Sequence, residues 1–367
     1  MKNGPYVRVR SVRQPKRIRI AVLLAALLVA ASWKVNADDA TTNAPSSQPP
    51  TTKPAVIKPA VSKTASTQPA SDPKDVKSDG ISAPGSDDKG PPLPLHQIEG
   101  NGGIFSTLSA YIVNPPRDGE PVGRPSVGAA FIYLGHDKDI EALTITESPW
   151  KRIELGYGWD RLGLGNLPAA LRNVGLVNYR ENEVQLHNFN ARFQILEEGE
   201  FDQKWLPALT AGVHYKYNDG ISEVNRETFG ALSKAGITKD NGTDFTLYAS
   251  KTFTQLPRPV ILELGGRATE AVWDGLGGFT DNYNFVFEGN VVVLVTNNIA
   301  LAAEYKQQPR DYQAIGNLVQ KESDWWTLDA AYVVNKHLTL AVGYAHFGDV
   351  LNDQANGVFG VTTKYEF

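Results

Sequence analysis

The sequence has no cysteine, a single methionine and, after residue 37, no apolar run long enough to cross a membrane as a helix. Without cysteine, a chain of 367 residues cannot be a disulfide-stapled scaffold. A hydrophobic fraction of 41% without long apolar runs also excludes a helical membrane protein. The chain must therefore build its structure from shorter elements.

Motifs of common enzymes and metal sites are missing as well. The sequence contains no G-x-S-x-G, no H-E-x-x-H, no Gly-rich phosphate loop and no EF-hand spacing. Its six histidines are scattered singly, which does not indicate zinc. We therefore predict that the protein is not an enzyme and has no cofactor and no metal site.

The first 37 residues have the pattern of an export signal. Basic residues precede the apolar run "IAVLLAALLVAA", which is followed by "VNA" and then by Asp38 and Asp39. This order predicts a signal peptide over 1–37, cleaved after Ala37. The alternative is an uncleaved anchor, but the apolar run is far shorter than the roughly 20 residues that a spanning helix needs.

Removal of this segment makes the chain strongly acidic. Residues 1–37 hold eight Lys and Arg and no acidic residue, so the formal net charge changes from −4 to −12. Phosphate binding requires a cationic surface, so nucleic acid is not expected as a partner. Export of a chain without cysteine fits a bacterial envelope.

Residues 38–95 consist largely of Pro, Ser, Thr, Ala and Lys and contain no aromatic side chain. Such a composition cannot bury enough apolar surface to fold, so we predict a disordered linker. It is either a spacer that reaches peptidoglycan or a periplasmic protein, or an inert tail; its composition fits both.

After Gly100 the dominant sequence period is two, which indicates β-strands of about ten residues separated by Gly, Asn, Asp and Pro. Twelve strands are predicted near 125–135, 139–147, 151–160, 185–196, 206–217, 244–254, 260–271, 283–295, 298–306, 325–334, 337–346 and 357–367.

The two faces of these strands and the loops between them indicate an outer-membrane barrel. In "LTAGVHYKY", apolar residues alternate with Thr210, Gly212, His214 and Lys216. The connections alternate between short and long, which is the pattern of bacterial barrels with short periplasmic turns. We predict an all-β fold: a transmembrane antiparallel barrel of about 12 strands over 125–367, in contact with outer-membrane lipid.

The chain ends with "GVTTKYEF", a strand pattern that places Tyr365 and Phe367 on the apolar face. We expect this strand to close the barrel. A terminal aromatic residue on its outward face resembles the signal that the barrel-assembly machinery reads, and we assign that role to Tyr365 and Phe367.

A thirteenth strand-like stretch lies at 102–115, inside a Gly-rich lead-in that covers 96–124. Bacterial single-chain barrels have even strand numbers, so this stretch needs another place. It lies in the lumen, lies in the periplasm, or pairs with a further strand in 163–184. We favour a position in the lumen or at its rim.

The chain from about Gly100 to Phe367 resembles an uncharacterised family of bacterial outer-membrane proteins catalogued as domain of unknown function 3034. The residues that carry the resemblance are "EGNGGIFSTLSAYIVNP", "KRIELGYGWDRLGLG", "WLPALTAGVHYKYND", "DNGTDFTLYASKTF", "IALAAEYKQQP" and "HLTLAVGYAHFGDV". The resemblance implies a barrel and brings no catalytic residues.

Charged residues on the inward phase are the candidate functional residues, because such residues set the ion preference of pores or fill small barrels as pairs. The candidates are Glu263, Arg267, Arg192, His214, Lys216, Glu304 and Asp329. Glu263 and Arg267 form either a constriction or a simple ion pair, and His214 is either a general base or a hydrogen-bonded filler. A narrow pore and a filled interior both fit a barrel of this size.

The first expectation for function is a pore or transport channel for small solutes. A second is a structural or docking barrel whose linker ties the outer membrane to periplasmic partners. A third is a barrel enzyme acting on lipid or peptide, which would need a cluster of Ser and His, or of Asp and His, at one rim.

Overall fold

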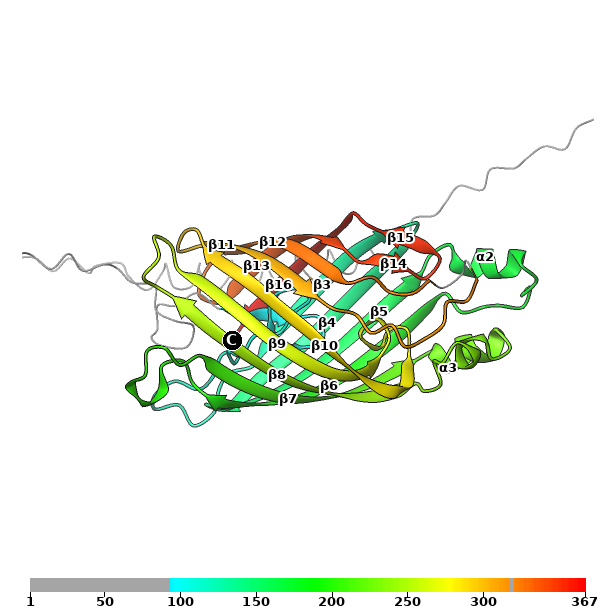
Figure 1. The fold of residues 1–367 in the computed structure, drawn as a ribbon. Helices are drawn as coiled ribbons and strands as arrows, with labels where there is room; N and C mark the ends of the chain where they lie inside the picture. Colours follow the sequence, from blue (N-terminus) through cyan, green and yellow to red (C-terminus); the bar gives the residue numbers. More distant parts are fainter. Residues whose placement is uncertain (1–92, 317–319) are drawn as a thin grey trace, which may run out of the picture. The chain divides into compact units, whose positions relative to one another are not determined.

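The computed structural model describes residues 93–316 and 320–367. Twelve antiparallel strands of this part of the chain close into a barrel (Figure 1), so the all-β fold class and the strand number are confirmed. Each strand pairs with the next one along the chain, and the last strand closes the barrel by pairing with the first. The predicted signal peptide and almost all of the predicted linker lie outside the described residues.

Every predicted strand lies within a few residues of an observed one. The barrel strands are β3 (Ser126–Gly135), β4 (Lys138–Trp150), β5 (Ile153–Leu164), β6 (Glu183–Leu196), β7 (Ala208–Asp219), β8 (Asn241–Phe253), β9 (Val260–Ala271), β10 (Phe279–Leu294), β11 (Ile299–Lys306), β12 (Trp325–Val333), β13 (Leu338–His346) and β16 (Val358–Glu366).

The barrel has its apolar face outside. On β7, Val213 and Tyr215 are exposed, whereas His214 and Lys216 on the opposite face are fully buried. The other strands repeat this pattern, and their exposed residues include large aliphatic and aromatic side chains. A soluble barrel would have the opposite polarity, so the outward face suits contact with lipid.

The two ends of the barrel differ (Figure 1). One end, called here the loop end, holds most of the long connections. They contain α2 (Leu167–Asn173), α3 (Ile221–Glu227), α4 (Ala231–Lys234), η2 (Trp273–Gly275), β14 (Gly348–Val350) and β15 (Asp353–Ala355). The opposite end, called the turn end, has shorter connections, including one with η1 (Glu200–Asp202). None of the helices in the described ranges has the length and hydropathy to cross a membrane.

The first hairpin is the exception at the loop end. β3 and β4 are joined by only His136 and Asp137, with φ angles of 50° and 59°. Positive φ at both central residues is what a type I′ turn between twisted strands requires. β3 therefore begins, and β16 ends, at the turn end, where both ends of the barrel sequence meet.

Residues 93–115, called here the lumenal segment, lie inside the barrel. The segment forms a small hairpin of β1 (Leu95–Gln97) and β2 (Asn101–Gly103) and is almost entirely buried. Beyond β2 it leaves strand geometry, although 102–115 has a strand-like pattern, because its backbone bonds to side chains of the wall. The range 163–184 supplies no partner strand for it; that range contains α2 and ends of β5 and β6.

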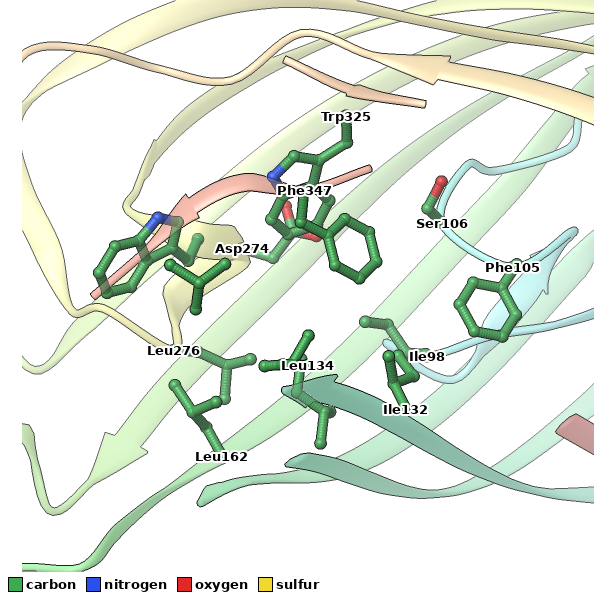
Figure 2. Close-up of a pocket in the computed structure, with 13 residues that line it drawn as sticks. Ile98, Phe105, Ser106, Ile132, Leu134, Leu162, Asp274, Leu276, Trp325 and Phe347 are labelled. Carbon is green, nitrogen blue, oxygen red and sulfur yellow. The ribbon is translucent and has the colours of Figure 1, made fainter. Parts of the chain in front are cut away.

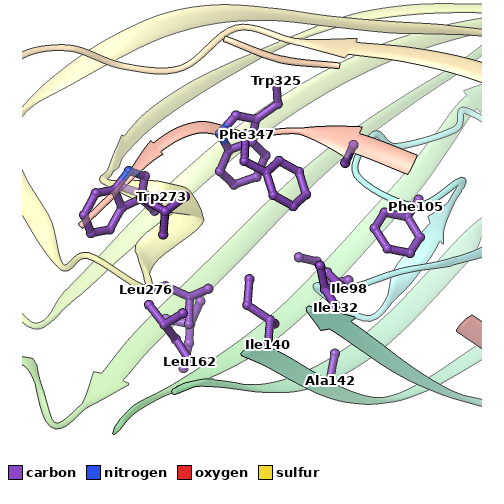
Figure 3. Packing of buried hydrophobic residues seen from close by; sticks show 14 of the residues in the cluster. Ile98, Phe105, Ile132, Ile140, Ala142, Leu162, Trp273, Leu276, Trp325 and Phe347 are labelled. Atoms are coloured by element: carbon purple, nitrogen blue, oxygen red, sulfur yellow. The ribbon is translucent and has the colours of Figure 1, made fainter. Parts of the chain in front are cut away.

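An apolar cluster fills the space between the lumenal segment and the loop end (Figure 3). It joins Ile98 and Phe105 of the segment to inward residues of the wall such as Ile132 and Leu162, and to Trp273 of the connection between β9 and β10. Burial of such side chains contributes about 1.5–3 kcal/mol each. In this state the lumen is thus packed by the segment and by an inward-folded connection.

Candidate functional site

The candidate site is the set of charged wall residues that hold the lumenal segment. The residue of the lumenal segment at the centre of these contacts is Glu99. Its carboxylate accepts hydrogen bonds from Nη1 and Nη2 of Arg267, each at 2.9 Å. Lys216 forms an ion pair with the same carboxylate. Asp244 lies 2.8 Å from both cations, and Glu288 accepts from Nε of Arg267 at 2.8 Å.

All members of this cluster are buried, and each charge faces an opposite charge. Burial by itself would raise the pKa of Glu99, but Arg267 and Lys216 outweigh it and hold the pKa well below its usual range. Glu99 therefore stays ionised at neutral pH. A buried ion pair of this kind fixes position more than it adds stability, and removal of one partner is strongly unfavourable.

A second anchor is Glu304 on β11. Its carboxylate accepts hydrogen bonds from the backbone N–H groups of Phe105, Ser106 and Thr107, at 2.7–3.2 Å. Thr327 donates its hydroxyl to the same carboxylate at 2.7 Å. Successive N–H groups that converge on one anion form a nest, which is among the strongest ways to bind a peptide backbone.

A third anchor holds the carbonyl groups of the segment. Arg192 donates to the carbonyl oxygen of Gly102 at 2.9 Å and to that of Ser109, and it pairs with Glu154 at 2.9 Å. Glu154 accepts in turn from the N–H of Gly102 at 3.1 Å. The wall thus satisfies backbone groups that a buried irregular segment would otherwise leave unpaired.

Glu263 and Arg267 do not form the predicted ion pair, although they lie on the same strand. Glu263 accepts from the hydroxyl groups of Ser109 at 2.5 Å and Ser250 at 3.0 Å, whereas Arg267 binds Glu99. The reason is the lumenal segment, which lies against both residues and supplies each with its own partner.

His214 and Asp329, the remaining candidates, are both buried. His214 shares hydrogen bonds with Asn101 at 3.2 Å and Thr246 at 3.0 Å, which is the arrangement of a hydrogen-bonded filler. Oδ2 of Asp329 lies 2.6 Å from the hydroxyl oxygen of Thr327, and Asp329 makes no hydrogen bond to the segment among the described residues. Within the same ranges no group of three or more His, Asp or Glu is arranged to hold a metal ion.

Sequence reasoning missed two important residues in the lead-in. Glu99 is not among the sequence-based candidates, although it is the single acidic residue that directly precedes "GNGG". His96 was also missed; its ring lies 2.6 Å from the hydroxyl of Ser126 and 2.8 Å from that of Thr144. This is a Ser–His contact near the turn end, but the second ring nitrogen faces a hydroxyl instead of a carboxylate.

Glycine on the wall lets the segment approach. A Cβ added to Gly156 would lie 2.0 Å from the carbonyl oxygen of Gly100, and one on Gly158 would lie 2.6 Å from that of Glu99. Gly100 itself has a φ of 86°, which favours glycine. The turn that presents Glu99 thus rests directly on the β5 backbone.

On the outside, Tyr365 and Phe367 lie together near the end of β16. Their rings are 5.1 Å apart in an edge-to-face arrangement, and Tyr365 also stacks on His337. Phe367 is 53% exposed. The predicted outward phase of this strand is therefore the observed one.

The sequence matches the protein family described as "Protein of unknown function (DUF3034)" over residues 97–360. The chain belongs to this family. The match begins two residues before Glu99, so it includes most of the lumenal segment as well as the barrel. A search of curated proteins returned no match.

Several solved structures have a similar fold. The KdgM porin is 9% identical with a TM-score of 0.40 and aligns over 66% of this chain and 99% of its own. Omp33 from Acinetobacter baumannii is 7% identical with a TM-score of 0.37, over 66% and 98%. Outer membrane phospholipase A from Escherichia coli is 11% identical with a TM-score of 0.31, over 67% and 97%.

Proposed function

We propose that the protein is a bacterial outer-membrane channel for small solutes that its own lumenal segment closes. Two features of the barrel support this. Its outward face is apolar along the strands. Its inward face carries charged and polar side chains on the same strands. Such a wall suits a barrel that spans the lipid and can enclose water.

The observation that carries the proposal is what fills the lumen. In a barrel that serves only as an anchor, wall side chains would pair mainly with each other. Here Glu304, Arg192 and Arg267 bind a separate segment that precedes the barrel in sequence. Displacement of that segment would leave a lumen lined by charged groups, which is how pores are lined.

An enzyme is the weaker alternative. The hydroxyl group of Ser126 contacts His96, but Ser126 is 0% exposed. Both ring nitrogens of His96 face hydroxyl groups and not a carboxylate, so among the described residues this pair does not form an accessible, activated nucleophile. We therefore propose no catalytic role, cofactor or metal.

The remaining partners follow from the same proposal. The apolar outer face would contact outer-membrane lipid, and the aromatic pair Tyr365 and Phe367 would be read by the barrel-assembly machinery. An export signal over 1–37 would deliver the chain, and the linker would reach peptidoglycan or a periplasmic protein. Nucleic acid is not proposed as a partner.

Single-channel conductance of the full mature chain in planar bilayers tests the proposal. Glu99→Gln leaves Lys216 and Arg267 with one buried anion fewer, so the segment should detach more often and openings should become more frequent. Asp219→Asn, at an exposed position on β7, is the matched control and should leave the opening frequency unchanged.

A cross-link supplies the converse test. The N–H of Ala110 lies 2.8 Å from the hydroxyl of Ser250, so a disulfide in the double variant Ala110→Cys and Ser250→Cys should pin the segment. Oxidation should abolish openings and reduction should restore them. If neither the wild-type chain nor Glu99→Gln conducts, the docking barrel replaces the channel as the best interpretation.

A further inference from the structure

The lumen contains narrow apolar cavities beside the polar anchors. The first lies under the loop end, between the Trp325 and Phe347 rings and the aliphatic residues Ile132 and Leu134 (Figure 2). The second lies closer to the turn end, and all of its lining residues are apolar except Asp329. They include Leu93, Phe105, Ala300, Ala331 and Ala341.

A third cavity lies at the turn end, against the connection between β10 and β11 at Thr296 and Asn298. The three cavities follow one another along the lumen. Phe105 lines both the first and the second, whereas Leu93 and Ala300 line both the second and the third. The series therefore runs from the loop end to the turn end, and side chains of the lumenal segment, Phe105 and Leu93, divide it.

Some of the residues that line the cavities carry a buried polar atom that lacks a partner among the described residues. Oγ of Ser106 and Nε1 of Trp273 and Trp325 belong to residues that line the first cavity, and Oδ1 of Asp329 belongs to the second. All four residues are more than nine-tenths buried. A buried polar atom without a partner is costly, so a molecule that supplies one hydrogen bond there would be favoured.

We propose that solutes pass along this apolar route, with Phe105 as its gate, and that they are uncharged molecules with an apolar body of about one ring and one hydroxyl or carbonyl group. The inference rests on the proposed channel function and names its solute class. The lining offers a charged solute only two carboxylates, Asp274, which already pairs with Lys306, and Asp329; the other lining side chains are uncharged, so a charged solute would lose its hydration along most of the route. In the closed state each cavity is only about as wide as a water molecule, so passage requires Phe105 to move.

The absence of native cysteine allows a direct test by thiol labelling. Ala331→Cys places a thiol in the second cavity, and Ala341→Cys is a second such site. Ser250→Cys is the control among the polar anchors, and Val174→Cys, at a loop position that is 65% exposed, gives the intrinsic reactivity. Each variant of the full mature chain is treated in detergent with N-ethylmaleimide or with a sulfonated maleimide.

After normalisation to Val174→Cys, both cavity variants should favour the uncharged reagent by at least about tenfold, because a sulfonate must shed its hydration to enter. Benzyl alcohol, as an uncharged probe of the proposed class, should slow labelling at Ala331→Cys but not at Val174→Cys. Adding Phe105→Ala should accelerate labelling at Ala331→Cys.

Three results would overturn the route: equal reactivity toward the two reagents at the cavity variants, no labelling of either cavity variant, or labelling of Ser250→Cys as fast as that of Ala331→Cys. An unchanged rate with Phe105→Ala would overturn the gate. Labelling does not depend on ionic current. Selective labelling with a silent bilayer would therefore refute passage through a channel and leave an accessible apolar path, whereas unselective labelling with bilayer currents would refute the solute class and leave the channel.

Discussion

Glu304 and Thr107 are 197 residues apart in sequence, yet one carboxylate oxygen of Glu304 accepts both the N–H of Thr107 at 2.7 Å and its hydroxyl at 2.6 Å. The N–H groups of Phe105 and Ser106 point to the same carboxylate. A single wall residue therefore holds three consecutive backbone donors of the lumenal segment, and a neutral side chain cannot replace it.

Glu304→Gln should loosen residues 105–107. The amide NH₂ of glutamine would face N–H donors, and each buried donor left unpaired costs about 1–3 kcal/mol. Hydrogen exchange at these three amides should accelerate while the amides of β7 stay protected. Asp219→Asn is the control and should leave the exchange of 105–107 unchanged; equal acceleration in both variants would contradict the role of Glu304.

Gly158→Ala should expel the turn that carries Glu99 without unfolding the barrel. The new Cβ would lie 2.6 Å from the carbonyl oxygen of Glu99, whereas alanine is readily accommodated in a strand. The lumenal segment should become sensitive to added protease. Gly357→Ala, where a Cβ would meet only Tyr344 at 3.5 Å or more, should remain resistant.

The barrel itself could be predicted because the alternation of residues within each strand shows which side chains point outward. Each strand alternates apolar and polar residues, and one face must meet lipid, so a register error would expose every polar side chain of that strand. For β7, this pattern alone placed His214 and Lys216 inside, where the structure has them. The outward phase of Phe367 followed from the same rule.

The contents of the lumen could not be predicted this way. The lumenal segment takes its conformation from side chains more than 50 residues away, such as Arg192 and Glu304, and not from its own periodicity. Its apolar residues resemble a strand, but its N–H and C=O groups are satisfied by the wall. For the same reason, the spacing of Glu263 and Arg267 on one strand suggested that they contact each other, and no sequence pattern identified Glu99 as the partner of Arg267.

Deletion of Phe367 should lower the amount of folded barrel in the outer membrane of cells much more than Lys364→Gln does. Phe367 is half exposed on the outward face and packs on Tyr365, where it can anchor the closing strand at the lipid interface. Lys364 is buried inside and donates to the carbonyl oxygen of Pro94 at 2.5 Å. Heat-modifiable gel mobility of the membrane fraction measures the folded amount. The reverse order would contradict the assembly role.

A buried carboxyl group at the loop end sets a further expectation. Oε1 of Glu322 accepts the N–H of Trp273 at 2.6 Å, and Oε2 has no partner among the described residues. Burial raises the pKa of Glu322 well above its usual range, and Asp274 adds to the effect, while the Trp273 N–H, Lys306 and Arg310 oppose it. We therefore expect Glu322 to couple the packing of this connection to pH.

The packing of residues 307–316 and 320–324 should weaken as pH rises. Because the folded pKa of Glu322 lies above the unfolded value of about 4.3, the folded form binds more protons between the two values, and stability falls across that interval and levels off above it. Glu322→Gln keeps the acceptor for Trp273 and carries no charge, so its protection should exceed that of the wild type at neutral and higher pH. Hydrogen exchange, corrected for intrinsic rates, measures this from about pH 4 to about pH 9. Asp311→Asn, which changes an exposed carboxylate in the same connection, should retain the wild-type slope, and an unchanged slope in Glu322→Gln would remove Glu322 as its source.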